Sequence, residues 1–265
     1  IGATVAPFIV GGSSDAAYWL YGYFALICAA GLAIDAMRRW AWLSVLALAL
    51  AYGGGQLVLM ASGGEGWFFL FLTAIALLAV LVPCRSLSPD QGGPMLSEAV
   101  WARGAKGWPL FPARIAAGSI AVSSFGLAMT AGQVPSEGIM AFFCLTLLSG
   151  ALIFWSARAR ALSDLAALPA AGFIARLVLE GTDGWPLAWD YSEKMLSLRA
   201  PEVAPPMTVA MLLGLAAALT LLAAWRSGRG SDHRAIWAAG AALIAPVSAV
   251  ALELFWAPSL VIGAY

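Results

Sequence analysis

Two ionisable side chains lie four residues apart inside a strongly apolar stretch of the sequence. Arg176 and Glu180 belong to the run SDLAALPAAGFIARLVLEG, residues 163–181. On an α-helix this spacing places both side chains on one face. A guanidinium and a carboxylate on a shared face could bind an anionic or polar substrate. They could also form an ion pair that joins helices without any ligand.

Glu253 and Asp15 are the acids that could complete such a site. Glu253 falls near the end of the last long apolar run, and Asp15 follows a Gly-Gly-Ser-Ser run ahead of the first one. The place of Asp15 resembles that of an acidic general base in multi-spanning glycosyltransferases that use lipid-linked sugars, although a helix N-cap is the simpler interpretation. Arg176, Glu180, Glu253 and Asp15 are therefore the candidate substrate-binding residues.

The sequence predicts neither a metal site nor a cofactor. His233, the single histidine, falls in a basic loop rather than in an apolar run, which argues against haem ligation within a membrane. Cys28, Cys84 and Cys144 lie in or at the end of apolar runs without C-x-x-C spacing, so we interpret them as packing residues. Walker A, G-x-G-x-x-G, H-E-x-x-H and G-x-S-x-G patterns are all missing from the sequence.

Composition assigns most of the protein surface to lipid. Of the 265 residues, 62% are hydrophobic and 11% are charged, whereas a soluble domain carries about 25% charged residues. The net charge is zero, which gives no argument for a nucleic-acid partner. The composition therefore predicts a multi-pass membrane protein whose main partner is the lipid bilayer.

Eight apolar runs are long enough to cross a bilayer, which takes about 20 residues. We expect spans near 17–37, 40–61, 67–84, 112–131, 138–157, 161–181, 207–226 and 234–256. The apolar run at 1–11 is too short to cross, so we expect a partial helix there and a chain that is a fragment of a longer protein. The predicted fold is an all-α, polytopic transmembrane helical bundle, with residues 1–265 as one domain.

Basic residues alternate from loop to loop, which predicts the orientation of the chain. The intervening loops ASGGEG and AGQVPSEG contain no Lys or Arg, and 182–206 is predicted as an outer interfacial loop. Because basic loops stay on the cytoplasmic side of a bacterial inner membrane, the alternation also requires 161–181 to cross. The predicted cytoplasmic loops are 38–39, 85–111, 158–160 and 226–234.

Several local features carry expectations of their own. We expect a short helix near 94–103 and an amphipathic helix over 188–199 that lies on the outer surface. Asp164 resembles a helix N-cap. Pro169 lies inside the predicted span 161–181 and should bend it.

Two polar side chains in or beside the first two spans are expected to find local partners. Asp35 precedes Arg39 by four residues, which favours an ion pair at the membrane interface. Gln56 lies within the second span and is expected to form a hydrogen bond to a neighbouring helix.

The N-terminal third of the chain resembles a family of bacterial predicted membrane proteins grouped as domain of unknown function 2339. The resemblance implies a much longer protein with many more spans, often after an N-terminal coiled coil, and it supplies no activity and no catalytic residue. It rests on a Gly-Pro-Val helix end, a Gly/Ser loop with an aromatic residue, a Gly-Tyr pair and a basic turn: Gly2, Pro7 and Val10; Gly11–Ser14 and Trp19; Gly22 and Tyr23; Arg38, Arg39 and Trp40.

Two functions are compatible with these features. In the first, a bacterial inner-membrane protein handles a lipid-linked or polysaccharide envelope substrate at the outer face, as a transferase or a transporter. In the alternative, the protein is a non-catalytic scaffold or accessory subunit that binds other membrane subunits. A substrate site requires Arg176, Glu180 and Glu253 to converge on a water-filled cleft, whereas a scaffold leaves them paired or dispersed and presents an exposed apolar face.

Overall fold

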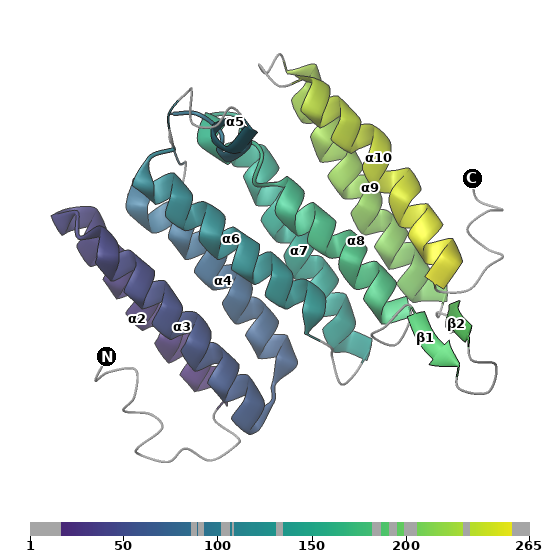
Figure 1. Cartoon of the computed structure of the whole chain (residues 1–265), viewed down its shortest axis with the longest axis horizontal. Helices are drawn as coiled ribbons and strands as arrows, with labels where there is room; N and C mark the ends of the chain where they lie inside the picture. The colour runs from purple at the N-terminus through teal and green to yellow at the C-terminus, as the bar shows by residue number, and fades with distance from the viewer. Residues whose placement is uncertain are drawn as a thin grey trace.

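Long apolar helices run side by side through the computed structural model, as the composition predicts (Figure 1). The structure describes residues 17–85, 89, 93–101, 107, 109–130, 135–181, 187–190, 195–198, 206–229 and 234–255. Seven segments in these residues are long and apolar enough to cross a membrane, and a further apolar helix, Trp237–Leu252, is shorter. The helices are α2 Ala17–Arg38, α3 Ala41–Ser62, α4 Glu65–Cys84, α6 Phe111–Met129, α7 Pro135–Trp155, α8 Ala167–Gly181, α9 Pro206–Gly228 and α10 Arg234–Phe255.

The prediction of an all-α polytopic bundle is confirmed. Helices α2, α3, α4, α6, α7, α9 and α10 begin and end within about three residues of the predicted bounds, which is the expected error of such boundaries. The partial helix predicted at 1–11 lies outside the described residues.

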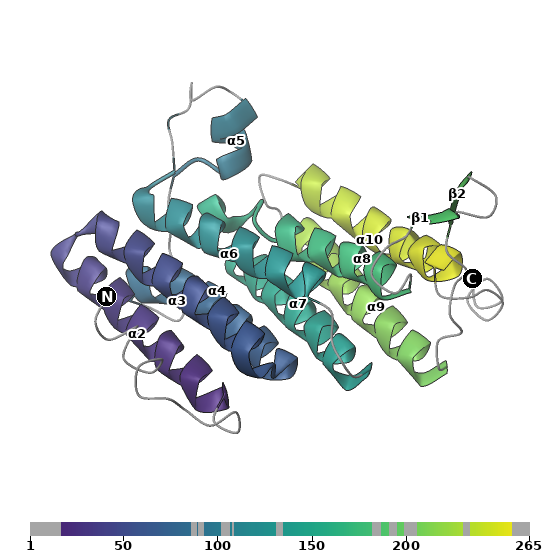
Figure 2. The same ribbon diagram turned by 60° about the horizontal axis from the view of Figure 1, so that its bottom comes forward.

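The eight long helices of the described chain form two layers of four. Helices α2, α4, α7 and α9 contact one another in sequence and form one layer, and α3, α6, α8 and α10 form the other (Figures 1 and 2). The α2–α3 pair therefore lies at one edge of the bundle and the α9–α10 pair at the opposite edge. The buried core runs between the layers and is rich in phenylalanine, leucine and alanine.

Glycines allow the helices near the α2–α3 edge to approach closely. A Cβ atom at Gly54 would lie 2.6 Å from Cε1 of Phe24, and one at Gly55 would overlap the ring of Phe71. In a membrane, close van der Waals packing replaces much of the hydrophobic driving force between helices. These two glycines of α3 therefore seat the aromatic rings of α2 and α4 directly against its backbone.

The sixth predicted span begins later than expected as a regular α-helix. A 3-10 helix, Arg160–Leu162, and turns precede α8, which begins at Ala167. Pro169 explains the delay, because its ring would clash with the carbonyl of residue 165 in a continuous helix and it has no N–H to donate. The whole segment from Arg160 to Glu180 is still long and apolar enough to cross a membrane.

Two short elements lie outside the helix layers. Helix α5, Leu96–Trp101, confirms the helix predicted near 94–103. The helix predicted over 188–199 is wrong, because β1 (Leu187–Asp190) and β2 (Met195–Leu198) pair as antiparallel strands, with Trp189 opposite Leu196. A twelve-residue helix is marginal without tertiary support, whereas strand pairing satisfies the same backbone groups.

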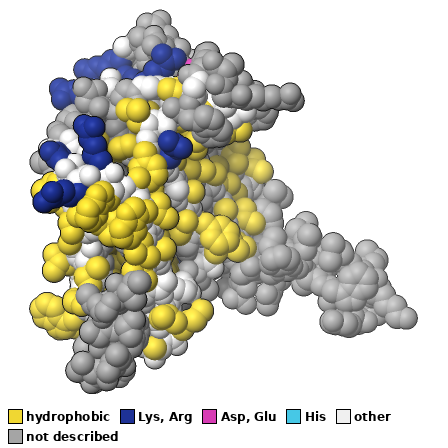
Figure 3. Space-filling view, turned by 60° about the vertical axis from the view of Figure 1, so that its left-hand side comes forward, with side chains coloured by type: hydrophobic (Ala, Val, Ile, Leu, Met, Phe, Trp, Pro, Cys, Tyr) yellow, Lys and Arg dark blue, Asp and Glu magenta, His cyan; other side chains and the backbone are white. Residues whose placement is uncertain are grey.

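The two ends of the bundle differ in charge. Arginines gather at the end that holds the α2–α3 and α7–α8 turns, and Figure 3 shows them above a hydrophobic surface at the α2–α3 edge. We call this the basic end. We call the opposite end the glutamate end, because Glu65, Glu137 and Glu180 lie there.

Candidate functional site

Arg176 lies buried near the glutamate end, with 1% of its surface exposed. Its Nη1 donates a hydrogen bond to the carbonyl oxygen of Thr130, the residue that follows α6. Its Nη2 lies 2.8 Å from Oε2 of Glu180, and its guanidinium carbon lies 5.7 Å from the ring centre of Phe69 in α4. The side chain therefore joins α8 to α6 and α4.

The electrostatic surroundings of Arg176 compensate its charge. The carbonyl of Thr130 lies at the C-terminal end of α6, where the helix dipole favours a cation. Glu180 supplies a full negative charge and the face of Phe69 a partial one. An arginine buried in a membrane protein is costly unless it is paired in this way.

Glu180 is held against α7 as well as paired with Arg176. A Cβ atom at Gly138, in the first turns of α7, would overlap Oε1 of Glu180, so the carboxylate packs directly on that backbone. The side chain of Glu180 is 26% exposed, which leaves one side of the carboxylate open. The Arg176–Glu180 pair thus joins α8 to α4, α7 and the C-terminal end of α6.

For the other two candidate substrate residues, Asp15 and Glu253, the structure does not describe the side chain. Asp15 lies outside the described residues, and Glu253 lies in α10 with a side chain that is also outside them. The structure therefore brings Arg176 and Glu180 together, as their spacing predicts. A substrate site that includes Asp15 and Glu253 stays a prediction.

A polar cluster in the middle of the bundle was missed by the sequence analysis. The hydroxyl of Tyr52 lies 2.7 Å from Oγ of Ser119 and 2.8 Å from Oγ of Ser123. Ser123 Oγ donates to the carbonyl of Leu72 at 2.7 Å, so the cluster joins α3, α6 and α4. The available signal was the four-residue spacing of the two serines, which places both on one face of an apolar span.

Gln56 does not form the predicted hydrogen bond to a neighbouring helix. Its side chain is exposed on the outward face of α3, and no residue in the described part of the chain bonds to its amide. The reason is its position on the helix, because Gly54, Gly55 and Val58 are the buried residues around it and face the bundle. Gln56 is therefore a polar group on the surface that faces lipid or a partner.

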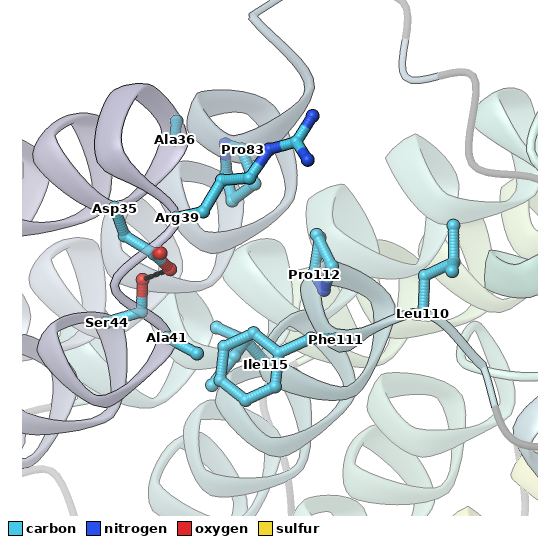
Figure 4. A pocket seen from close by; sticks show the side chains of 10 residues that line it. All are labelled: Asp35, Ala36, Arg39, Ala41, Ser44, Pro83, Leu110, Phe111, Pro112 and Ile115. Carbon is cyan, nitrogen blue, oxygen red and sulfur yellow. Dashed lines mark hydrogen bonds between the residues drawn. The ribbon is translucent and has the colours of Figure 1, made fainter.

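The ion pair predicted between Asp35 and Arg39 is absent from the described residues. Asp35 Oδ2 accepts a hydrogen bond from Oγ of Ser44, while the guanidinium of Arg39 is directed away from Asp35 (Figure 4). Helix α2 ends at Arg38, and Arg39 has a left-handed backbone with φ 58°. The four-residue rule applies within a helix, so it does not hold across this helix end.

Asp164 caps a different helix from the one predicted. Its Oδ2 accepts the backbone N–H of Ser97 at 2.6 Å, in the first turn of α5. Arg160 Nη2 lies 3.2 Å from Oε1 of Glu98 in the same short helix. These two contacts hold α5 over the α7–α8 connection at the basic end.

The basic end also contains a cavity of about 550 Å³ (Figure 4). It lies where the α2–α3 turn meets the end of α4 and the start of α6. Most of its lining is apolar, with Asp35, Ser44 and Arg39 as polar members. The apolar members include Pro83, Leu110, Phe111 and Ile115.

No protein family, no curated protein and no solved structure matches this chain. The resemblance of the N-terminal third to the family grouped as domain of unknown function 2339 therefore stays a prediction.

Proposed function

We propose that this protein is a non-catalytic scaffold or accessory subunit that assembles within the membrane through the outward face of α3. The observation that carries the proposal is the exposed amide of Gln56 inside a span. Several other polar side chains of the described spans support it, because they join helices within the bundle.

In three of these contacts a side chain bonds to the backbone of a neighbouring segment. Arg176 bonds to the carbonyl of Thr130, and Ser149 Oγ donates to the carbonyl of Ala166 at 3.2 Å. Arg226 Nη2 donates to the carbonyl of Ser156 at 2.7 Å. Each of these groups satisfies a backbone acceptor within the bundle, which is a structural role.

Gln56 differs from these groups because it faces outward. It lies six residues before the end of α3, which is about 9 Å along the helix axis at 1.5 Å per residue. An amide at this depth has no water to bond with, and an unsatisfied polar group in hydrocarbon is costly. A helix from another subunit that offers a donor and an acceptor would remove this cost.

The neighbours of Gln56 suit the approach of another helix. Gly53 is exposed, and a Cβ atom there would meet nothing within 4 Å, so a partner backbone can come close. Leu57 and Met60 are exposed beside it and offer apolar contact. Figure 3 shows that hydrophobic side chains cover much of the α2–α3 edge. The simplest partner is a second copy of this chain, because an amide carries both a donor and an acceptor and two Gln56 side chains would satisfy each other.

The test measures the association of the purified protein in lipid nanodiscs or mild detergent by light scattering. We expect the unaltered protein to dimerise and Gln56→Leu to weaken the dimer about 5- to 30-fold, the equivalent of one interhelical hydrogen bond. Gln56→Asn keeps an amide and should retain part of the affinity. The matched control is Leu221→Ala, at an exposed position of α9 on the opposite edge.

A protein that stays monomeric, or a Gln56→Leu variant that dimerises as well as the unaltered chain, would overturn the role given to this face. Disulfide cross-linking provides a second readout in a background without the native cysteines. Copies that carry Leu57→Cys, which keeps the amide of Gln56, should cross-link, and copies that carry Leu221→Cys should not.

We further propose that the basic end faces the cytoplasm of a bacterial inner membrane. The positive-inside rule supports this orientation, because the described arginines outside Arg176 gather at that end. The test is labelling of single cysteines in intact cells with a reagent that does not cross membranes. Ala61→Cys, exposed at the glutamate end, should be labelled, whereas Ala157→Cys at the basic end should react only after permeabilisation. The reverse pattern would contradict the orientation.

A further inference from the structure

The cavity at the basic end combines an apolar interior with a cationic rim. Phe111, Ile115 and Leu110 form one wall, and Pro83 lies at the end of α4 (Figure 4). Its volume of about 550 Å³ is within the range of small-molecule sites. The lining residues belong to the ends of α2, α3, α4 and α6, so the cavity lies at the level where a membrane-spanning helix meets the headgroups.

Arg39 presents a charge at the edge of this cavity, and in the described part of the chain no carboxylate pairs with it. Its backbone N–H donates to the carbonyl of Asp35 at 2.6 Å, which fixes the turn after α2. Asp35 also lines the cavity, and its Oδ2 accepts a hydrogen bond from Oγ of Ser44. The guanidinium of Arg39 extends away from Asp35, on the side of Pro83 (Figure 4). Among the residues that the structure describes, no carboxylate lies within ion-pair distance of Arg39.

A second arginine lies in α6, next to residues that line the cavity. Arg114 is exposed, and its guanidinium carbon lies 5.8 Å from the ring centre of Phe111, which lines the cavity. Arg85 has a different role, because its Nη2 donates to the carbonyl of Ala36 and ties the end of α4 to α2. Arg39 and Arg114 are therefore available to attract an anion. Arg85 instead holds the end of α4 against α2.

We propose that this cavity is a binding site for an anionic phospholipid. The phosphate is bound by Arg39 and Arg114, and the first part of an acyl chain lies against Phe111, Ile115 and Leu110. Basic pockets between helix ends recognise anionic headgroups in this way. The apolar lining favours a lipid over free phosphate, since inorganic phosphate would leave that lining in contact with water.

The experiment uses native mass spectrometry of the whole chain in detergent, with phosphatidylglycerol as the anionic probe and phosphatidylcholine as the zwitterionic one. We expect phosphatidylglycerol to bind more tightly, and Arg39→Gln and Arg114→Gln each to weaken it about fivefold. The matched control is Arg229→Gln, which removes an exposed charge that lies over Trp225 at the far edge of the bundle.

Two further arms separate a lipid site from a general anion site. Ala41→Leu fills the cavity without changing any charge and should also weaken phosphatidylglycerol binding. Inorganic phosphate should fail to displace the lipid at millimolar concentration. Displacement by phosphate, equal binding of the two lipids, or an equal loss in Arg39→Gln and Arg229→Gln would each overturn the proposal. Thermal unfolding of each variant without added lipid shows whether it is folded. Arg39→Lys keeps the charge and should retain most of the binding, so a loss as large as that in Arg39→Gln would also overturn the proposal.

Discussion

Replacement of Arg176 by leucine tests whether the buried guanidinium holds the bundle together. The substitution removes the hydrogen bond to the carbonyl of Thr130 and leaves Glu180 without its cation. A hydrogen bond to a charged group contributes about 1.5–3 kcal/mol, and a cation over an aromatic ring contributes about 0.5–2 kcal/mol.

The expected loss follows from these contributions and from the exposure of the partner. Breaking a fully buried ion pair costs about 3–5 kcal/mol. Glu180 is 26% exposed and can reach water or headgroups once it is released, which lowers that cost. We therefore expect Arg176→Leu to reduce the free energy of unfolding by about 2–4 kcal/mol.

The assay is equilibrium unfolding in mixed micelles, followed by circular dichroism. A loss of about 3 kcal/mol changes the unfolding equilibrium about a hundredfold, which such a titration resolves. The double variant Arg176→Leu with Glu180→Leu is the informative control. It should recover most of the stability, because it leaves no uncompensated charge. A single variant as stable as the unaltered protein would refute the role of Arg176 as a tie.

Three further substitutions test other contacts of the described chain. Gly138→Ala should cost about 1–3 kcal/mol of unfolding free energy in the same titration, since its Cβ would displace Glu180. Gly118→Ala, where nothing lies within 4 Å, is the control and should cost nothing. Tyr52→Phe should cost about 0.5–1.5 kcal/mol through loss of its two serine contacts. Asp164→Ala removes the cap of α5 and should speed protease cleavage in 85–111, whereas unchanged cleavage would show that α5 is held by other contacts.

The helices could be predicted because hydropathy is a property of each segment by itself. In lipid a segment must satisfy its own backbone, so a long apolar run has few alternatives to a helix. The same reasoning failed for residues 188–199, where the aqueous or interfacial setting lets Leu187–Asp190 pair with Met195–Leu198 instead. It also misplaced the start of α8, because the effect of Pro169 depends on the carbonyl one turn earlier.

The polar contacts were predictable only where both partners lie in one helix. Arg176 and Glu180 pair as their spacing predicts, but the contact with Thr130 joins residues 46 apart in the chain. No spacing rule reaches that far. The predicted ion pair of Asp35 with Arg39 failed for a related reason. Arg39 follows α2 with a left-handed backbone, so its side chain is out of the helical register.

Arg176, Ser149 and Arg226 bond to groups inside the bundle, whereas two polar side chains at its surface point outward. Gln56 and Arg39 both belong to the α2–α3 edge, the first on the outward face of α3 and the second at the turn before it. In a membrane protein an unsatisfied polar group persists where another molecule completes it. Gln56 lies deep in the span and matches the donor and acceptor of another helix, whereas Arg39 lies at the headgroup level and matches a phosphate.

The distance between these two groups makes their roles separable. Fifteen residues of α3 separate Ala41 from Gln56, which is about 22 Å along the helix axis. Groups this far apart without shared partners contribute independently. Loss of the amide should therefore weaken assembly and leave phospholipid binding intact, and loss of the arginine should do the reverse. A single substitution that abolished both would indicate that the lipid itself forms part of the contact between subunits.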